Sequence, residues 1–161
     1  MGTNELSALL WKERELLELL HFKLEEEHLL LVSGKSQWIS LATREIENIL
    51  EKVHAAGLSR ALEASRVATQ WGIDPAAPLS RIIEAAPAGP WNEILTAHLN
   101  ALRDTTAEVT RLRDANEQYL RAAFRSTQET LATLGEDTSL YGPAGTSAAH
   151  RPGAHIIDTN L

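Results

Sequence analysis

Residues 9–31 read LLWKERELLELLHFKLEEEHLLL, and this stretch contains neither proline nor glycine. Its leucines recur at steps of three and four, which places them on one side of an α-helix. Counted from Leu6, just before this stretch, the seam positions are Leu6, Leu10, Glu13, Leu17, Leu20, Leu24, Glu27 and Leu31. Leu9, Leu16 and Leu30 flank this seam, so the apolar stripe is wider than a two-stranded coiled coil needs. We therefore expect a long helix that buries its stripe against other long helices.

Two glutamates stand at seam positions, where a buried carboxylate is costly unless it has a partner. Two interpretations fit Glu13 and Glu27. In one, the buried stripe is rotated toward Leu9 and Leu16, which releases the carboxylates to solvent. In the other, the carboxylates meet Arg or Lys side chains across the interface. Because a wide stripe is easily rotated, we favour the first.

Composition limits the class of protein. The chain has 161 residues, of which 43% are hydrophobic, and this is enough for one domain with a core. It has no cysteine, so a disulfide framework, a thiolate nucleophile and a cysteine metal site are excluded. The net charge of −7 argues against a nucleic-acid partner. No signal-peptide pattern or membrane-spanning apolar run is present, so we expect a cytoplasmic protein without stable membrane insertion.

The first two long helices follow from the positions of glycine. The first is predicted from about residue 4 to residue 32 and ends before Gly34, which suits a left-handed cap. The second is predicted from residue 36 to about residue 71, and Gly57 weakens its interior by roughly 1 kcal/mol relative to alanine. Its predicted inward residues are Trp38, Ile39, Ala42, Ile46, Ile49, Leu50, Val53, Leu62, Val67 and Ala68.

The remaining helices lie in the second half of the chain. One or two helical turns are predicted between Pro75 and Pro90, and a third long helix from Trp91 to about Leu134, before Gly135. The predicted inward residues of this third long helix are Trp91, Leu95, His98, Leu102, Val109, Leu112, Tyr119, Ala123, Phe124 and Leu131. This helix is longer than its partners, so some of its apolar surface near the end should stay uncovered.

The predicted fold is all-α. Residues 1–135 should form an antiparallel three-long-helix coiled-coil bundle with a short connecting helix. Residues 136–161 are rich in Gly, Pro, Ala, Ser and Thr and lack helical periodicity, so we expect an extended, flexible C-terminal tail.

One pattern could hold a metal. Glu25 and His28 repeat the spacing of Glu51 and His54, and Glu-x-x-His pairs bind metals in di-iron bundles. Those bundles need four core helices, and here the pairs stand beside the predicted seams, so we favour chance. His98 faces inward and is expected to be a hydrogen-bonded core histidine rather than a catalytic base. No nucleophile elbow or phosphate loop is present, so we expect no enzyme, no catalytic residue and no cofactor.

Several stretches resemble a known family. They are Leu-Trp-Lys-Glu-Arg-Glu-Leu-Leu at residues 10–17, Phe-Lys-Leu-Glu-Glu at residues 22–26, Gly34-x-x-x-Trp38, APAGPWNEIL at residues 86–95 and Leu-Tyr-Gly-Pro-Ala-Gly at residues 140–145. Over nearly its whole length the chain resembles the flagellar export chaperones of the FlgN family. The resemblance implies a cytoplasmic type III secretion chaperone. It would bind the C-terminal segments of hook-associated proteins (FlgK/FlgL-type cargo), prevent their premature assembly and deliver them to the export gate.

The partner-binding surface is expected on the third long helix. Its predicted residues are Tyr119, Leu120, Phe124, Thr127, Leu131 and Leu134. The resemblance also implies that a tyrosine near the C-terminus contacts the export gate, and both Tyr141 and Tyr119 are candidates. The competing interpretation is that Tyr119, Phe124 and Leu131 fill the core. The second function considered is a self-associating coiled-coil scaffold or adaptor, which would be a homo-oligomer, and the third is a helical-bundle di-metal enzyme.

Overall fold

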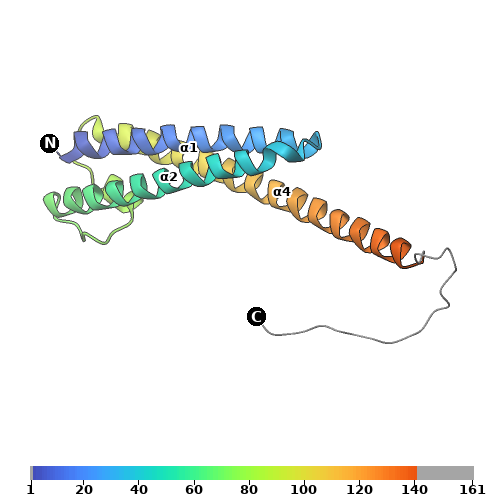
Figure 1. Cartoon of the computed structure of the whole chain (residues 1–161). Coiled ribbons are helices and arrows are strands. Elements are labelled where there is room, and N and C mark those ends of the chain that lie inside the picture. The colour runs from blue at the N-terminus through green and yellow to red at the C-terminus, as the bar shows by residue number, and fades with distance from the viewer. Residues whose placement is uncertain (1, 141–161) are drawn as a thin grey trace, which may run out of the picture. The chain divides into compact units, whose positions relative to one another are not determined.

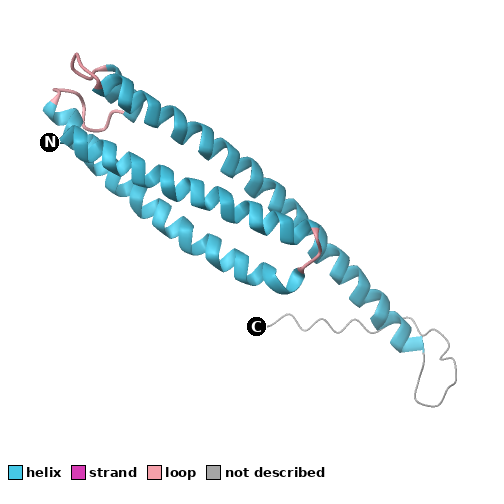
Figure 2. Cartoon of the chain, turned by 90° about the horizontal axis from the view of Figure 1, so that it is seen from above, coloured by secondary structure: helices cyan, strands magenta, loops and turns pink. Residues whose placement is uncertain are grey.

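A computed structural model describes residues 2–140 of the chain, with side chains described up to residue 135. The described part is all-helical, as predicted, and contains no strand. The helices are α1 (Gly2–Val32), α2 (Ser36–Gln70), α3 (Leu79–Glu84) and α4 (Trp91–Leu140). Figure 1 shows them in chain order, from blue α1 through green α2 to α4, and Figure 2 shows the loops that join them. No helix in residues 2–140 has an apolar stretch long enough to cross a bilayer.

The chain divides into two compact units, residues 1–120 and residues 121–161. The first unit holds α1, α2, α3 and the first 30 residues of α4. The described part of the second unit is the remainder of α4.

The bounds of α1 and α2 are close to those predicted. The first helix ends at Val32, and Gly34 follows it with φ 70°, which is the left-handed conformation that glycine adopts without strain. The second helix runs through Gly57 without a break. A Cβ built on Gly57 would lie 3.4 Å from Glu13 Oε1, an ordinary contact, so this glycine is not required by close packing.

The predicted end of the third long helix is wrong. α4 continues through Gly135 to Leu140, so the first residues assigned to the tail are helical. A single glycine costs a helix only about 1 kcal/mol, and the next residue that cannot continue a helix is Pro143. The rest of the predicted tail, residues 141–161, lies outside the described residues.

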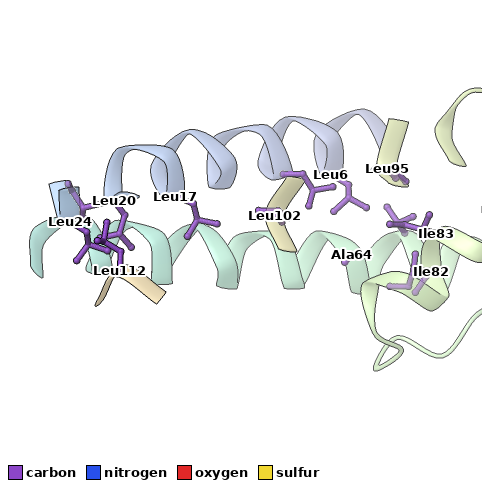
Figure 3. Close-up of a cluster of buried hydrophobic side chains, with 14 of the residues drawn as sticks. Leu6, Leu17, Leu20, Leu24, Ala64, Ile82, Ile83, Leu95, Leu102 and Leu112 are labelled. Atoms are coloured by element: carbon purple, nitrogen blue, oxygen red, sulfur yellow. The ribbon is translucent and has the colours of Figure 1, made fainter. Parts of the chain in front are cut away.

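The seam predicted on α1 is the core of the first unit. All its positions from Leu6 to Glu27 are buried, and Leu31 is half-buried. Figure 3 shows the labelled seam leucines between the ribbons of α1 and α2, together with labelled side chains of α3 and α4. The members of this buried cluster from the other helices are Ile46, Ile49, Ala64, Val67, Ala68, Ile82, Ile83, Leu95, Leu102 and Leu112. Burial of each large apolar side chain contributes about 1.5–3 kcal/mol, so this cluster is the main source of stability.

Three predicted inward residues of α2 are wrong. Trp38, Leu50 and Leu62 have exposed fractions of 51%, 45% and 62%. Their side chains are exposed to solvent rather than packed in the core. An apolar residue type alone does not show which side chains of α2 a neighbouring helix covers, so the sequence did not separate these three residues from buried ones such as Ile46 and Ile49.

Polar contacts fix the directions of the helices within the first unit. Glu13 pairs with Arg60 and Glu27 with Thr43, so α1 and α2 run antiparallel. Ser7 contacts His98 and residue 28 contacts residue 116, so α1 and the first part of α4 run parallel. The coiled-coil form of their packing stays a prediction.

The interpretation that rotates the stripe of α1 is wrong. Glu13 is buried and accepts a hydrogen bond from Arg60 Nε at 2.5 Å, which is the cross-interface pair of the second interpretation. Glu27 is buried too, but its partners are neutral: Thr43 Oγ1 donates to it at 2.9 Å and Asn116 Nδ2 at 3.0 Å. Both carboxylates therefore stay at the seam because α2 and α4 supply donors.

Asn116 is the centre of a buried polar network. Its side-chain amide donates to the backbone carbonyl of Leu24 at 2.9 Å and to Glu27. Its Oδ1 lies 2.8 Å from His28 Nδ1, and because this oxygen can only accept, the histidine donates. The residue is 1% exposed, and both its amide group and its Oδ1 have partners within the protein. The network joins α1, α2 and α4 at one level.

Asn116→Ala should lower the free energy of unfolding by about 2 kcal/mol, because it removes one of the two described donors to the buried Glu27, the side-chain donor to the carbonyl of Leu24 and the acceptor of His28 Nδ1. Urea denaturation followed by circular dichroism measures this. The matched control is Asn100→Ala at an exposed position of α4. It should leave the value unchanged or raise it by up to about 0.7 kcal/mol, since alanine is the better helix former. Equal losses in both variants would contradict the network.

Gly57→Ala should raise the free energy of unfolding by about 0.5–1 kcal/mol, because the position is helical and the added methyl makes only ordinary contacts. Gly34→Ala should lower it by about 1–2 kcal/mol, since φ at this position is positive. Both are measured in the same denaturation experiment. A shift of the same sign in the two variants would show that the assigned backbone conformations are wrong.

Candidate partner-binding surface

The second unit carries large apolar side chains that are exposed. Every described side chain from residue 121 to residue 135 is exposed. Phe124, Leu131 and Leu134 have exposed fractions of 66%, 63% and 55%. With Thr127 they follow one another at steps of three and four, so they lie on one face of α4. The Thr127 hydroxyl donates to the backbone carbonyl of Ala123 at 3.0 Å, so its polar group is already satisfied.

The interpretation that Tyr119, Phe124 and Leu131 fill the core is wrong. The inward series of α4 is buried at Leu95, His98, Leu102 and Leu112, and the larger residues after it are exposed. Tyr119 is 47% exposed. The role of the exposed residues in partner binding stays a prediction.

Two predicted residues of this face belong to the first unit. Tyr119 packs edge-on against the ring of His28, with centroids 5.4 Å apart and planes at 83°. Because His28 is itself held by Asn116, the tyrosine ring stands directly beside the buried network. Leu120 is half-buried. Tyr141, the other tyrosine candidate, lies outside the described residues.

A groove within the first unit has no counterpart in the sequence predictions. It has a volume of about 720 Å³ and is open to solvent. Its apolar side chains are Leu17, Leu79, Leu99, Leu102 and Ala107, and the Glu13–Arg60 pair lies among them. No sequence pattern marks it, because the lining comes from four helices.

A second apolar surface lies where α1 and α2 are joined. Leu29, Val32, Trp38 and Leu41 have exposed fractions between 51% and 65%. Beside them Lys23 Nζ bridges Glu26 at 2.7 Å and Glu45 at 2.8 Å. These two hydrogen-bonded carboxylates raise the pKa of Lys23 above its ordinary value. The predicted motif residue Trp38 is thus a surface residue rather than a core residue.

His98 lies in a pocket that α1 and α4 form. The histidine is buried, as predicted, and Ser7 Oγ lies 3.2 Å from its Nε2. Arg14 Nη1 lies 3.4 Å from its Nδ1, and the guanidinium stacks over the Trp11 ring at 4.6 Å. Burial lowers the pKa of His98 below its usual 6.5, and the charge of Arg14 lowers it further. The imidazole is therefore neutral at pH 7.

The two Glu-x-x-His pairs do not form a metal centre in the described part of the chain. Glu25, Glu51 and His54 are exposed. His28 is engaged by Asn116. No group of three or more His, Asp or Glu side chains that could hold a metal ion occurs among the residues whose side chains are described.

Comparison with known proteins identifies one family. The model of the FlgN protein family matches residues 1–149. No curated protein and no solved structure shows a significant match.

Acidification should destabilise the fold through His98. The unfolded state takes up a proton near pH 6.5, whereas the folded state resists it, so the free energy of unfolding falls as the pH drops through 6.5 toward the lowered pKa of the folded state. His98→Gln should therefore lose less stability than the wild type between about pH 7.5 and 5.5 in urea denaturation. The exposed His54→Gln should behave as the wild type. In NMR titration, Arg14→Gln should raise the pKa of His98, and no rise would remove Arg14 as a cause.

Proposed function

Since the family model matches residues 1–149 of 161, the chain belongs to the FlgN family of flagellar export chaperones, and from this premise we propose its cargo and binding mode. The cargo is the C-terminal segment of hook-associated proteins of the FlgK/FlgL type. Bound to the chaperone in the cytoplasm, this segment cannot assemble prematurely and is delivered to the export gate. The proposal includes a coiled-coil bundle of the three long helices and assigns no catalytic step.

The observation that carries the proposal is the exposed apolar face of α4. A helix whose large side chains are more than half exposed is a ready surface for an amphipathic partner helix, whose apolar residues recur at the same spacing. We assign the cargo contact to Leu120, Phe124, Thr127, Leu131 and Leu134. Phe124 supplies the largest apolar area and is the expected hot spot.

Reversibility follows from the state of the cargo. A segment that becomes helical only on binding loses about 2–5 kcal/mol of the gross interaction energy to ordering. The complex is then specific, because the side-chain spacing must match, but it dissociates readily. A chaperone that hands its cargo on needs both properties.

Contact with the export gate is assigned to a tyrosine. Tyr119 is half-exposed and its ring is positioned by His28. Tyr141 is the alternative by its place in the sequence. Tyr119 and Tyr141 are therefore both proposed as candidates for the contact with the export gate.

Phe124→Asp and Leu131→Asp should each weaken binding of a synthetic hook-associated protein C-terminal peptide by about 10-fold or more, because a carboxylate replaces a buried apolar anchor. Isothermal titration calorimetry measures the affinity, and circular dichroism verifies that the helices persist. Leu62→Asp is the matched control. This leucine is 62% exposed on α2, so the same change alters net charge without touching α4.

Two results would contradict the proposal. One is the absence of binding between the wild-type protein and junction-protein C-termini. The other is a tight, cargo-independent dimer in sedimentation that Phe124→Asp dissociates, because the exposed face would then serve self-association, as in a scaffold.

A further inference from the structure

We propose that the pocket around Arg14, between α1 and α4, binds a carboxylate side chain of a partner protein while a neighbouring apolar residue of that partner packs against Trp11. The pocket has a volume of about 510 Å³, and its main side chains are Asn4, Ser7, Trp11, Arg14, Ile94 and His98. None of them belongs to the face of α4 assigned to cargo. The inference therefore goes beyond the proposed function and does not depend on it.

The first argument is an arginine without a carboxylate partner among the described residues. Arg14 is half-buried, and its described contacts are the Trp11 ring and His98 Nδ1. Its Nε is shielded from solvent and has no hydrogen-bond partner in the described chain. A guanidinium that is partly shielded from water and has no anion beside it is in a costly position. An arriving carboxylate would offset that cost.

The second argument concerns the proton of His98. Arg14 can only donate, so Nδ1 must accept, and the single proton of the neutral imidazole is on Nε2. Nε2 then donates to Ser7 Oγ at 3.2 Å. This leaves the hydroxyl proton of Ser7 for a further acceptor. The pocket thus offers a guanidinium and a hydroxyl donor, which is the donor set that a carboxylate accepts.

The third argument concerns the walls, which favour a protein segment over a free small anion. Trp11 is 53% exposed and Ile94 38% exposed, and Ala8 and Ala97 also line the pocket. An acidic residue next to a leucine or similar residue would fill both parts of the site. A free carboxylate would leave the apolar part uncovered. Because the whole chain has a net charge of −7, long-range attraction does not assist this ligand, so recognition must come from these short-range contacts.

The test uses the full chain labelled with ¹⁵N and two capped tripeptides, N-acetyl-Leu-Glu-Leu-amide and N-acetyl-Leu-Gln-Leu-amide. The glutamate peptide should shift the Trp11 indole signal, assigned with Trp11→Phe, and the His98 ring signals in a saturable way. The glutamine peptide should bind about 10-fold or more weakly, as expected for loss of a charge-assisted hydrogen bond. Equal affinities for the two peptides would overturn the proposal.

Variants locate the site. Arg14→Gln should abolish the preference for glutamate, and Ser7→Ala should reduce it. Arg113→Gln is the matched control, because Arg113 is exposed and paired with Asp114, and it should keep the wild-type preference. Phe124→Asp should also keep it, so failure here is distinguishable from failure of the cargo proposal. An unchanged preference in a folded Arg14→Gln, or equal shifts with sodium acetate, would overturn the proposal.

Discussion

Two carboxylates buried on α1 determine how the neighbouring helices are positioned along it. Glu13 requires the guanidinium of Arg60 on α2, and Glu27 requires Thr43 on α2 and Asn116 on α4. Leucine contacts alone do not set a register strongly, since one leucine layer resembles the next. Sliding α2 by one turn would leave a desolvated carboxylate without donors, at a cost of several kcal/mol. The apolar seam supplies the stability of the first unit, and the acidic residues within it select one alignment.

That alignment also creates the surfaces that are open to partners. Because α1 and the first part of α4 run parallel with Ser7 beside His98, Arg14 comes to lie against the histidine rather than against an acidic residue. The same register brings His28 to Asn116 and to the ring of Tyr119. The polar contacts that fix the alignment of α1 with its neighbours therefore also determine the positions of Trp11, Arg14 and Tyr119 at the surface.

The sequence predicted the helices and the α1 seam well, because proline, glycine and the leucine period act locally. The sequence predicted less well the burial and the partners of side chains whose surroundings are supplied by another helix. The partners of Glu13 and Glu27 lie far along the chain, so the local pattern around the two glutamates does not reveal them. Leu62 is exposed although it is apolar, because no neighbouring helix covers it, and Gly135 lies inside α4 because one glycine does not end a helix. The Arg14 pocket draws on two distant segments and has no signature in either of them.

A gradient of protection should run along α4, which is one continuous helix with two different surroundings. Between Leu95 and Asn116 one face of the helix is buried in the core, so the amide hydrogens on that face should exchange with solvent only when the core opens. Between residues 121 and 135 all described side chains are exposed, and helical hydrogen bonds there are held mainly by the intrinsic preference of the sequence. Exchange in this second stretch needs only local fraying. Whatever covers the face of Phe124 and Leu131 would slow that fraying and would extend the rigid length of the helix without changing its fold.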